Sequence, residues 1–433
     1  MAAAAMFSSL HLHNYRLYAV GGLISNTGTW MGRVAQDWLV LTELTDYSST
    51  ALGLATGLQF LPFLVLAPWA GALADRFPKR RILLVTQSTL MATAALLAWL
   101  TLTGRVQLWQ VFVLAAVQGV AQALDNPARQ TFVGEMVGPD HLTNAVALNS
   151  ASFNAGRLLG PGVAGLLIAA YGTGVAMLAN AGSFVMMLLA LAAMRRGELQ
   201  PAPLARGKGK IREGIAYVRG RPDIKLVMVL VFVLGTFGMN FQMTTALMAT
   251  RVFEKGPTEF GVLGSVMAIG SLAAALLSAR RARPRLRVLL VALGGFTVAS
   301  ACAALAPTYA VFAVALVPCG MTALTALTTA NAFVQLAVDP VMRGRVMALY
   351  MAIFMGGTPL GAPLIGRLGD WAGPRWTIAV GSIAVGLTLV IVGAWLAGRE
   401  NVRVSYRRDR HPRWVVMRDP VGTASGSDPE VTK

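Results

Sequence analysis

The sequence predicts an all-α membrane protein in which twelve transmembrane helices form two pseudo-symmetric six-helix halves. Three observations lead to this fold class. The 433 residues are 55% hydrophobic and only 13% charged, with a mean hydropathy of +0.60, whereas a soluble protein carries about 25% charged residues. Apolar runs of about 18 residues or more, each long enough to cross a bilayer, recur along the chain. The chain also contains an internal repeat.

The repeat relates residues 127–172 to residues 328–373 without a gap, and 14 of these 46 positions are identical. The identical glycine, proline and phenylalanine residues of the first copy are those at positions 132, 139, 153, 156, 160, 165 and 172. Matches of these types are harder to obtain by chance in so apolar a chain than matches of Ala, Leu or Val. The repeated unit is too long for a solenoid, and it indicates a transporter built from two membrane-embedded halves.

The apolar runs are long and do not alternate with polar residues, so they predict helices. Either helices or barrel strands would satisfy the backbone polar groups in lipid. The spans are expected near residues 17–42, 50–74, 82–103, 108–125, 143–170, 173–194, 225–250, 259–279, 287–306, 309–334, 345–366 and 376–398.

The formal charge of +18 could indicate a nucleic-acid partner, but the positions of the bases argue against one. If the N-terminus is cytoplasmic, 30 of the 37 Lys and Arg residues lie on the inner side, five on the outer side and two inside spans. This bias is the positive-inside pattern of a protein whose partner is the lipid bilayer. It places both termini in the cytoplasm.

The spans divide the chain into five parts. These are a cytoplasmic N-terminus (1–16), a six-helix half (17–194), a basic linker (195–224), a second six-helix half (225–398) and a disordered cytoplasmic tail (399–433). In the linker, Ile211, Ile215 and Val218 share one helical face, which predicts a short amphipathic helix on the inner leaflet. A solvated linker is an equal alternative. Cys302 and Cys319 are expected to be apolar fillers inside spans. We expect no cleavable signal peptide, metal site or cofactor.

Polar residues inside the first half are the main candidates for function, because ionisable groups in a bilayer are costly. Helical periodicity places them on one face of each of three spans, which are expected to surround a central cavity. They are Asn26, Trp30, Arg33 and Asp37 in span one, Gln118, Gln122 and Asp125 in span four, and Asn154 and Arg157 in span five.

Two interpretations of Arg33 and Asp37 remain open. They could form a structural ion pair one turn apart, or Asp37 could be a proton carrier, since a low dielectric favours the neutral form of a carboxyl group. Asp125 is a rival carrier, although its place beside Asn126 near a helix end favours a cap or a latch. Arg157 has no carboxylate one turn away, so its partner must come from another helix or from the substrate.

The second half has no charged residue deep in a span. Asn240 in span seven, and Asn331 and Gln335 in span ten, could donate hydrogen bonds to a substrate. Several methionines could form an adaptable apolar wall, although the favoured interpretation is that they fill space between helices. They are Met239, Met243, Met248 and Met267.

The loop GALADRFPKRR, from Gly71 to Arg81, resembles the signature loop of the major facilitator superfamily. The residues that carry the gating part of the pattern are Gly71, Asp75, Arg76, Lys79 and Arg80. The resemblance implies the major facilitator fold. It also implies that Asp75 accepts from the N-terminal N–H groups of the second-half helix that starts near Arg345, which latches the cytoplasmic face. Pro78 replaces the usual second glycine, and the bases of the loop also set topology.

The string GRLLGPGVAG resembles the glycine-proline motif of superfamily antiporters through Gly156, Gly160, Pro161 and Gly165. The resemblance implies export and a seal against leak, and the alternative is ordinary small-residue packing. One departure concerns coupling. Drug antiporters of the superfamily often carry an arginine three residues before a glutamine of span four, where this chain has Ala115 before Gln118. Arg33 or Arg157 would have to replace that arginine.

Further strings resemble one branch, which includes the bacterial enterobactin exporter and macrolide efflux proteins. They are NYRLYAVGGLISNTGTWM, PARQTFV, NAVALNSASFNAGRLLGP and IREGIAYVRGRPDIK. The resemblance implies a monomeric secondary active exporter in the bacterial inner membrane. It would exchange protons for amphipathic small molecules such as drugs, macrolides or siderophores. The alternatives are a facilitator-type importer or uniporter of a nutrient or metabolite, and a membrane-embedded sensor. Nothing in the sequence predicts an enzyme.

Overall fold

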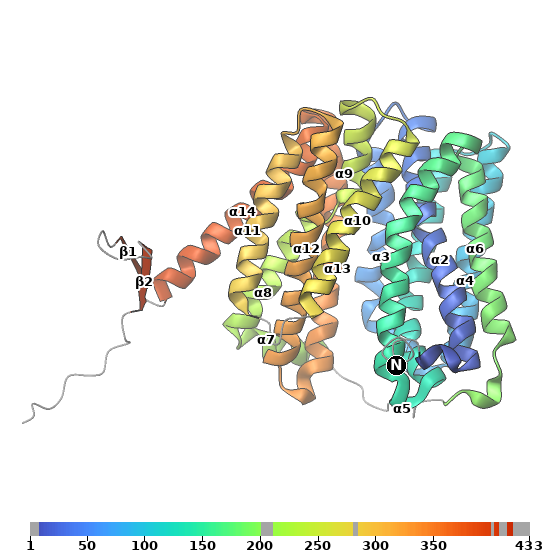
Figure 1. Ribbon diagram of the computed structural model, residues 1–433, viewed down its shortest axis with the longest axis horizontal. Coiled ribbons are helices and arrows are strands. Elements are labelled where there is room, and N and C mark those ends of the chain that lie inside the picture. The colour runs from blue at the N-terminus through green and yellow to red at the C-terminus, as the bar shows by residue number, and fades with distance from the viewer. Residues whose placement is uncertain (1–7, 201–210, 280–284, 400–401, 407–413, 419–433) are drawn as a thin grey trace, which may run out of the picture.

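A computed structural model describes residues 8–200, 211–279, 285–399, 402–406 and 414–418. Figure 1 shows two helical bundles side by side, with the first half in blue to green and the second in yellow to red. The elements of the first half are η1 (Ser8–His11), α2 (His13–Trp38), η2 (Leu39–Glu43), α3 (Ser49–Arg76), α4 (Lys79–Leu102), α5 (Leu108–Tyr171), α6 (Thr173–Ala193) and η3 (Arg196–Glu198).

The second half repeats this order after the linker helix α7 (Ile211–Arg219). Its elements are α8 (Pro222–Val233), η4 (Leu234–Gly238), α9 (Phe241–Leu247), η5 (Met248–Val252), α10 (Pro257–Ala279), α11 (Leu286–Ala304), α12 (Tyr309–Ala337), α13 (Pro340–Ala372) and α14 (Pro374–Arg399). We call the side that carries α7 the linker face, and the side that carries the 43–49 and 253–257 loops the opposite face.

The described helices make twelve crossings, as the sequence predicts. Ten stretches are long and apolar enough to span a membrane. One of them, α5, crosses twice, because Gly138 has φ 67° and reverses the chain between residues 108–137 and 139–171. A positive φ of this size suits glycine, which has no Cβ. The twelfth crossing is α2, whose buried polar residues, among them Asn14, Gln36 and Asp37, make it less apolar than the others.

The two halves meet mainly through two helix pairs, α3 with α13 and α5 with α10, and α9 adds smaller contacts with α2 and α3. Backbones approach closely at both. A Cβ added to Gly165 would lie 2.5 Å from the carbonyl oxygen of Pro257, and one added to Gly366 would lie 2.4 Å from that of Ser49. Gly165 and Gly366 are equivalent in the internal repeat, so the two contacts are copies of one another. Both lie at the opposite face.

The predicted linker helix is present as α7, and it packs against the second half. Glu213 forms an ion pair of 2.7 Å with Arg345 of α13, and the Tyr217 hydroxyl donates to Asp339 over 3.0 Å. Val218 is buried in the main hydrophobic core. This side of the helix therefore packs against protein of the second half, a contact that neither sequence interpretation includes.

The tail differs from the disorder expected after Arg399. Strand β1 (Val402–Tyr406) pairs antiparallel with β2 (Trp414–Arg418), with Val404 opposite Val416. β-branched and aromatic residues favour strands, and this short stretch is rich in them, unlike the polar residues that end the chain.

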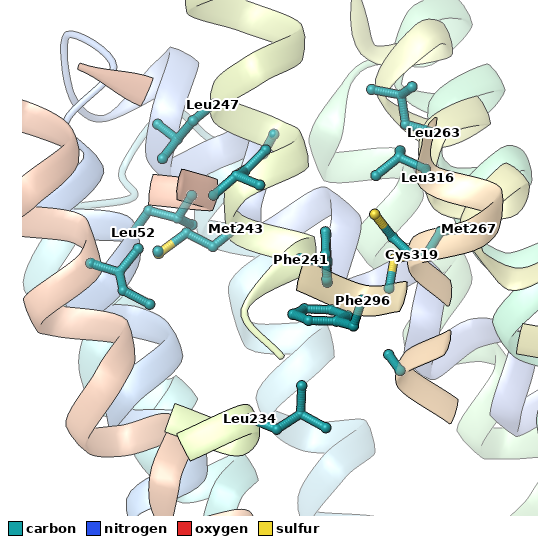
Figure 2. Packing of buried hydrophobic residues seen from close by; sticks show 14 of the residues in the cluster. Leu52, Leu234, Phe241, Met243, Leu247, Leu263, Met267, Phe296, Leu316 and Cys319 are labelled. Atoms are coloured by element: carbon teal, nitrogen blue, oxygen red, sulfur yellow. The ribbon is translucent and has the colours of Figure 1, made fainter. Parts of the chain in front are cut away.

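The main hydrophobic core is largest in the second half. Figure 2 shows Met243, Met267, Phe241, Phe296 and Cys319 within it. Phe241 meets Phe296 edge to face, with ring centroids 5.8 Å apart. Cys319 is a buried filler, as expected, whereas Cys302 is exposed on α11.

Candidate functional site

A cavity of about 450 Å³ lies between the halves. Its first-half wall carries most of the predicted polar residues, and its second-half wall is uncharged. The polar residues of the lining from the first half are Asn26, Thr29, Arg33, Asp37, Thr56, Gln59, Gln87, Gln122, Asp125, Asn126, Arg129 and Arg157. Such a volume suits a small organic ligand.

Arg33 is held in the cavity by contacts to its own helix and to two others. Its Nη2 donates to Oε1 of Gln122 over 2.8 Å. Its guanidinium carbon lies 5.0 Å from the ring centroid of Trp30 and 5.4 Å from that of Phe60, distances at which an aromatic face attracts a cation. Its Nε is buried without a hydrogen-bond partner.

Arg157 stacks on the same ring, with its guanidinium carbon 5.6 Å from the centroid of Trp30. Among the described residues it has no carboxylate within ion-pair distance. Its partner from another helix is thus an aromatic ring. Two guanidinium groups that share one ring favour cargo groups that accept hydrogen bonds.

Asp37 is buried, at 6% exposure, and bonded across the two halves. Its Oδ2 accepts from Nε2 of Gln242 on α9 over 2.8 Å. No ion pair between Asp37 and Arg33 is formed within 4.0 Å, so the structural ion pair considered from the sequence is wrong for this conformation. Each residue of the expected pair instead bonds an uncharged amide.

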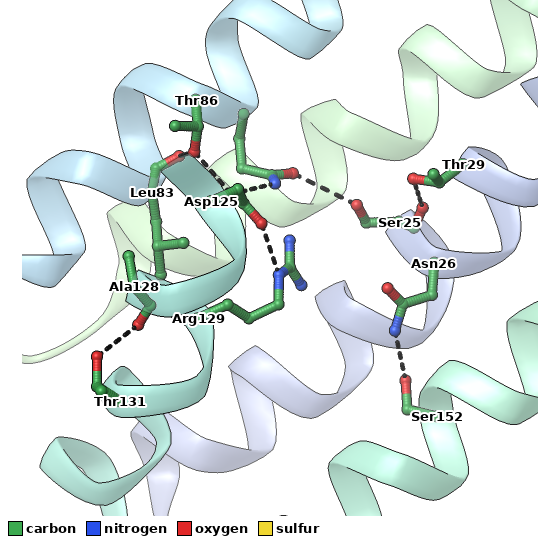
Figure 3. Close-up of polar contacts among 11 residues, drawn as sticks. Ser25, Asn26, Thr29, Leu83, Thr86, Asp125, Ala128, Arg129, Thr131 and Ser152 are labelled. Atoms are coloured by element: carbon green, nitrogen blue, oxygen red, sulfur yellow. Dashed lines mark hydrogen bonds and ion pairs between the residues drawn. The ribbon is translucent and has the colours of Figure 1, made fainter. Parts of the chain in front are cut away.

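Asp125 lies at the centre of a hydrogen-bond network, which Figure 3 shows. It accepts from the Thr86 hydroxyl over 2.6 Å, from Nε2 of Gln87 over 2.9 Å and from Nε of Arg129 over 2.8 Å. All three donors come from the first half, and one of them belongs to a cation, so the protein itself occupies this carboxylate. This favours a structural role and leaves Asp37 as the candidate carrier.

Two other predicted polar residues line the cavity and also form hydrogen bonds to neighbouring residues. Asn26, which lines the cavity, donates to the Ser152 hydroxyl (Figure 3). Asn240 lines it too and donates to the carbonyl of Thr236.

Four residues predicted for the cavity lie elsewhere. Gln118 borders a separate water-sized cavity of about 20 Å³ inside the first half. Asn154 donates to the carbonyl of Ser150, one turn earlier. Asn331 accepts from Gln335 over 2.6 Å near the linker end of α12, so these two amides satisfy each other and neither lines the cavity.

Of the four methionines considered for the apolar wall, three line the cavity and one does not. Met239, Met243 and Met267 line the cavity, whereas Met248 is fully buried in the core and does not. Together with Phe241 and Phe354 they make the second-half wall largely apolar.

In the loop that resembles the superfamily signature, the bases bond within the first half. Nζ of Lys79 lies 2.8 Å from Glu135 of α5, and each side chain is 8% exposed. Nε of Arg80 donates to the carbonyl of Leu191. Arg76 is exposed, and Gly71 has open space around it. Asp75 belongs to the last turn of α3, but its side chain lies outside the described part, so the expected latch stays a prediction.

The glycine-proline motif serves two contacts. Cβ atoms added to Gly156 and Gly160 would lie under 3 Å from α2, next to Asn26 and Trp30. One added to Gly261 of α10 would lie 2.3 Å from the carbonyl oxygen of Pro161. The motif thus packs the wall of the cavity on one side, and with Gly165 it closes the two halves together on the other.

Sequence reasoning missed four residues. Gln242 and Phe60 were not placed on the polar faces that helical periodicity marked, so no signal in the sequence singled them out. Glu135 and Asp370 lie near helix ends, where acids are common. The hydrogen bonds found between the halves in the described part all lie between the cavity and the opposite face, several of them at Asp370.

Comparison with known proteins gives the same fold and narrows the family. A family model described as transmembrane secretion effector matches residues 4–419. The staphyloferrin A transporter of Staphylococcus aureus is 25% identical over 360 residues, 82% of this chain and 90% of that protein. The multidrug efflux pump Tap of Mycolicibacterium fortuitum is 28% identical over 87% of this chain and 93% of its own. The enterobactin exporter EntS of Escherichia coli is 26% identical over 90% and 89%.

Solved structures resemble the chain at the level of fold. The nucleoside transporter NupG (D323A mutant) superimposes with a TM-score of 0.70 at 11% identity, covering 88% of this chain and 99% of NupG. A D-xylose-proton symporter gives 0.67 at 11% identity, covering 87% and 96%. The repeat, the twelve crossings and the family match over nearly the whole length agree: the chain belongs to the transmembrane secretion effector family of the major facilitator superfamily, and it is a multi-pass membrane transporter.

Proposed function

We propose that the protein is a secondary active exporter of amphipathic small molecules, such as drugs, macrolides or siderophores. It would lie in the bacterial inner membrane with the linker face in the cytoplasm. The observation that carries the proposal is the cavity between the halves, which combines two guanidinium groups on an aromatic ring with an apolar wall rich in methionine and phenylalanine. Relatives named as a siderophore transporter, a siderophore exporter and a drug efflux pump support this choice.

Alternating access would work by rocking the halves about the cavity. In the described conformation they touch at the opposite face through α3 with α13 and α5 with α10. With the proposed orientation, this is the cytoplasm-facing state that loads cargo. Parting these contacts and closing the linker face would release cargo outside.

We propose proton antiport through Asp37 as the drive. The charged side chains that share the cavity with Asp37 are Arg33, Arg129, Arg157 and Asp125, and the second-half wall adds none. Because Gln242 bonds Asp37 across the halves, parting of the opposite face would break this bond and open the carboxylate to the outside. A proton could then enter there and leave when the cavity faces the cytoplasm again.

The test is export from a host that lacks its own drug pumps, using erythromycin and staphyloferrin A as probes. The wild-type protein should lower the cellular content of at least one probe. Asp37→Asn should abolish export against a gradient while leaving exchange of labelled for unlabelled probe intact. Asp46→Asn, in an exposed loop of the opposite face, is the matched control. Normal uphill export by Asp37→Asn would show that Asp37 is not the carrier.

A further inference from the structure

The two contacts that close the opposite face are copies of each other, but among the described residues only one of them has a charged side chain that bonds across the halves. At the α3–α13 contact, Asp370 of the second half reaches the first turn of α3 in the first half. Its carboxylate accepts from the backbone N–H of Ser49 over 2.7 Å, from that of Thr50 over 2.9 Å, and from the Ser48 hydroxyl over 3.3 Å. The residue at the same place in the first copy of the repeat is Ala169.

These bonds satisfy groups that α3 cannot satisfy itself, because the first four N–H groups of a helix have no partner within it. Ser48 already accepts from Ala51 as the N-cap, so Asp370 supplies the remaining acceptors from outside. A carboxylate at a helix N-terminus also gains from the helix dipole. The nearest cation is Arg251, with Nη1 3.7 Å from Oδ1 of Asp370 and in the same half as Asp370.

All three bonds join one half to the other, so they exist only while the opposite face is closed. When the halves part, the N–H groups of Ser49 and Thr50 lose their acceptor, whereas the Arg251–Asp370 pair within the second half can persist. Asp370 therefore has a differential interaction with the two states, which is what a residue needs to shift their populations. Ala169 cannot do the same at the α5–α10 contact, where the described hydrogen bonds come from uncharged hydroxyls, Thr258 to the carbonyl of Gly165 over 3.5 Å and Ser265 to the carbonyl of Leu158 over 2.6 Å.

We propose that Asp370 is a positioning residue for transport: a latch that holds the opposite face closed by capping α3 across the two halves. It works at the other end of the helix pair for which the Asp75 latch is expected. Asp75 ends α3 at the linker face, where α13 begins, and Asp370 lies near the end of α13 at the opposite face, where α3 begins. The proposal rests on the alternating access of the proposed function, but not on the cargo or on proton coupling.

Distances between spin labels on the opposite face measure the latch directly. Labels at Arg105→Cys and Pro307→Cys, both exposed loop positions in different halves, report the separation in a background with Cys302→Ser and Cys319→Ala. Asp370→Asn keeps the shape and removes the charge. It should raise the ratio of the open to the closed distance roughly fivefold to thirtyfold, the effect of one charge-assisted hydrogen bond at a partly exposed site.

Two variants make the result specific. Asp370→Glu keeps the charge and should restore most of the closed population. Asp46→Asn removes an acid from the same face that has no such contact, and it should leave the distances unchanged. A transport readout follows as well, since the apparent affinity for cargo on the linker side should fall by the factor that the closed population loses.

The latch is overturned if Asp370→Asn gives the wild-type distance distribution, or if Asp46→Asn shifts it equally. Should Asp370→Asn not be recovered as a monodisperse protein, Asp370→Ser replaces it with the same expected direction. An unshifted distance distribution in an Asp370 variant that still exports would refute the latch but not the proposed function. The same single distance in every variant, together with no export, would refute the proposed function as well.

Discussion

Replacing Gly366 or Gly165 with alanine should push the two halves apart at the opposite face. A Cβ at Gly366 would sit 2.4 Å from the carbonyl oxygen of Ser49, and one at Gly165 would sit 2.5 Å from that of Pro257. Ordinary contact begins at 3.4 Å, so the backbones must separate by about 1 Å at each place. Backbone atoms cannot rotate away as the end of a flexible side chain can.

Overpacking of this kind costs about 1–3 kcal/mol, and each 1.4 kcal/mol is about a factor of ten in an equilibrium. The clash exists only while the halves touch. The closed state should therefore lose about fivefold to a hundredfold in population relative to the state with the opposite face parted. Because the two glycines are copies in the repeat, both substitutions should act in the same direction.

The spin-label pair at positions 105 and 307 reads this shift. Gly182→Ala is the matched control, because it adds the same methyl group to α6 with nothing within 4 Å. It should leave the distances unchanged. A wild-type distance distribution for both Gly366→Ala and Gly165→Ala would refute the claim that these two contacts close the opposite face. The contacts would then accommodate a methyl group without moving apart.

Two further predictions concern stability. Lys79→Met should lower the free energy of unfolding by about 3–5 kcal/mol, because it leaves Glu135 buried without its cation. A thermal melt measures this loss. The double variant Lys79→Met with Glu135→Gln should recover most of it. An unchanged melting temperature in the single variant would contradict the role of the pair. Gly138→Ala should cost about 1–2 kcal/mol, since φ 67° strains an L residue, and a melt equal to wild type would mean that the α5 turn rearranges freely.

The sequence was sufficient for the fold because hydropathy and the repeat act at the scale of whole helices. Helical periodicity also placed Asn26, Trp30, Arg33 and Asp37 on one face of α2, and all four line the cavity. Periodicity describes one helix at a time, however. It could not show that Arg33 would bond Gln122 of α5, or that Asp37 would bond Gln242 of the other half.

The same limit explains the residues that were placed wrongly. Asn331 and Gln335 are one turn apart, and the structure bonds them to each other. Asn154 bonds a carbonyl of its own helix. A polar side chain in a span can be satisfied locally or by a ligand, and only the packing of the neighbouring helices decides between the two.

Uptake into everted membrane vesicles under an imposed pH gradient tests proton-driven export most directly. With the interior acidic, vesicles that contain the wild-type protein should accumulate erythromycin or staphyloferrin A above its outside concentration, and a protonophore should abolish the accumulation. Asp37→Asn vesicles should equilibrate the probe without accumulating it. Equal accumulation by Asp37→Asn, or accumulation by the wild type that survives collapse of the gradient, would contradict proton antiport through Asp37.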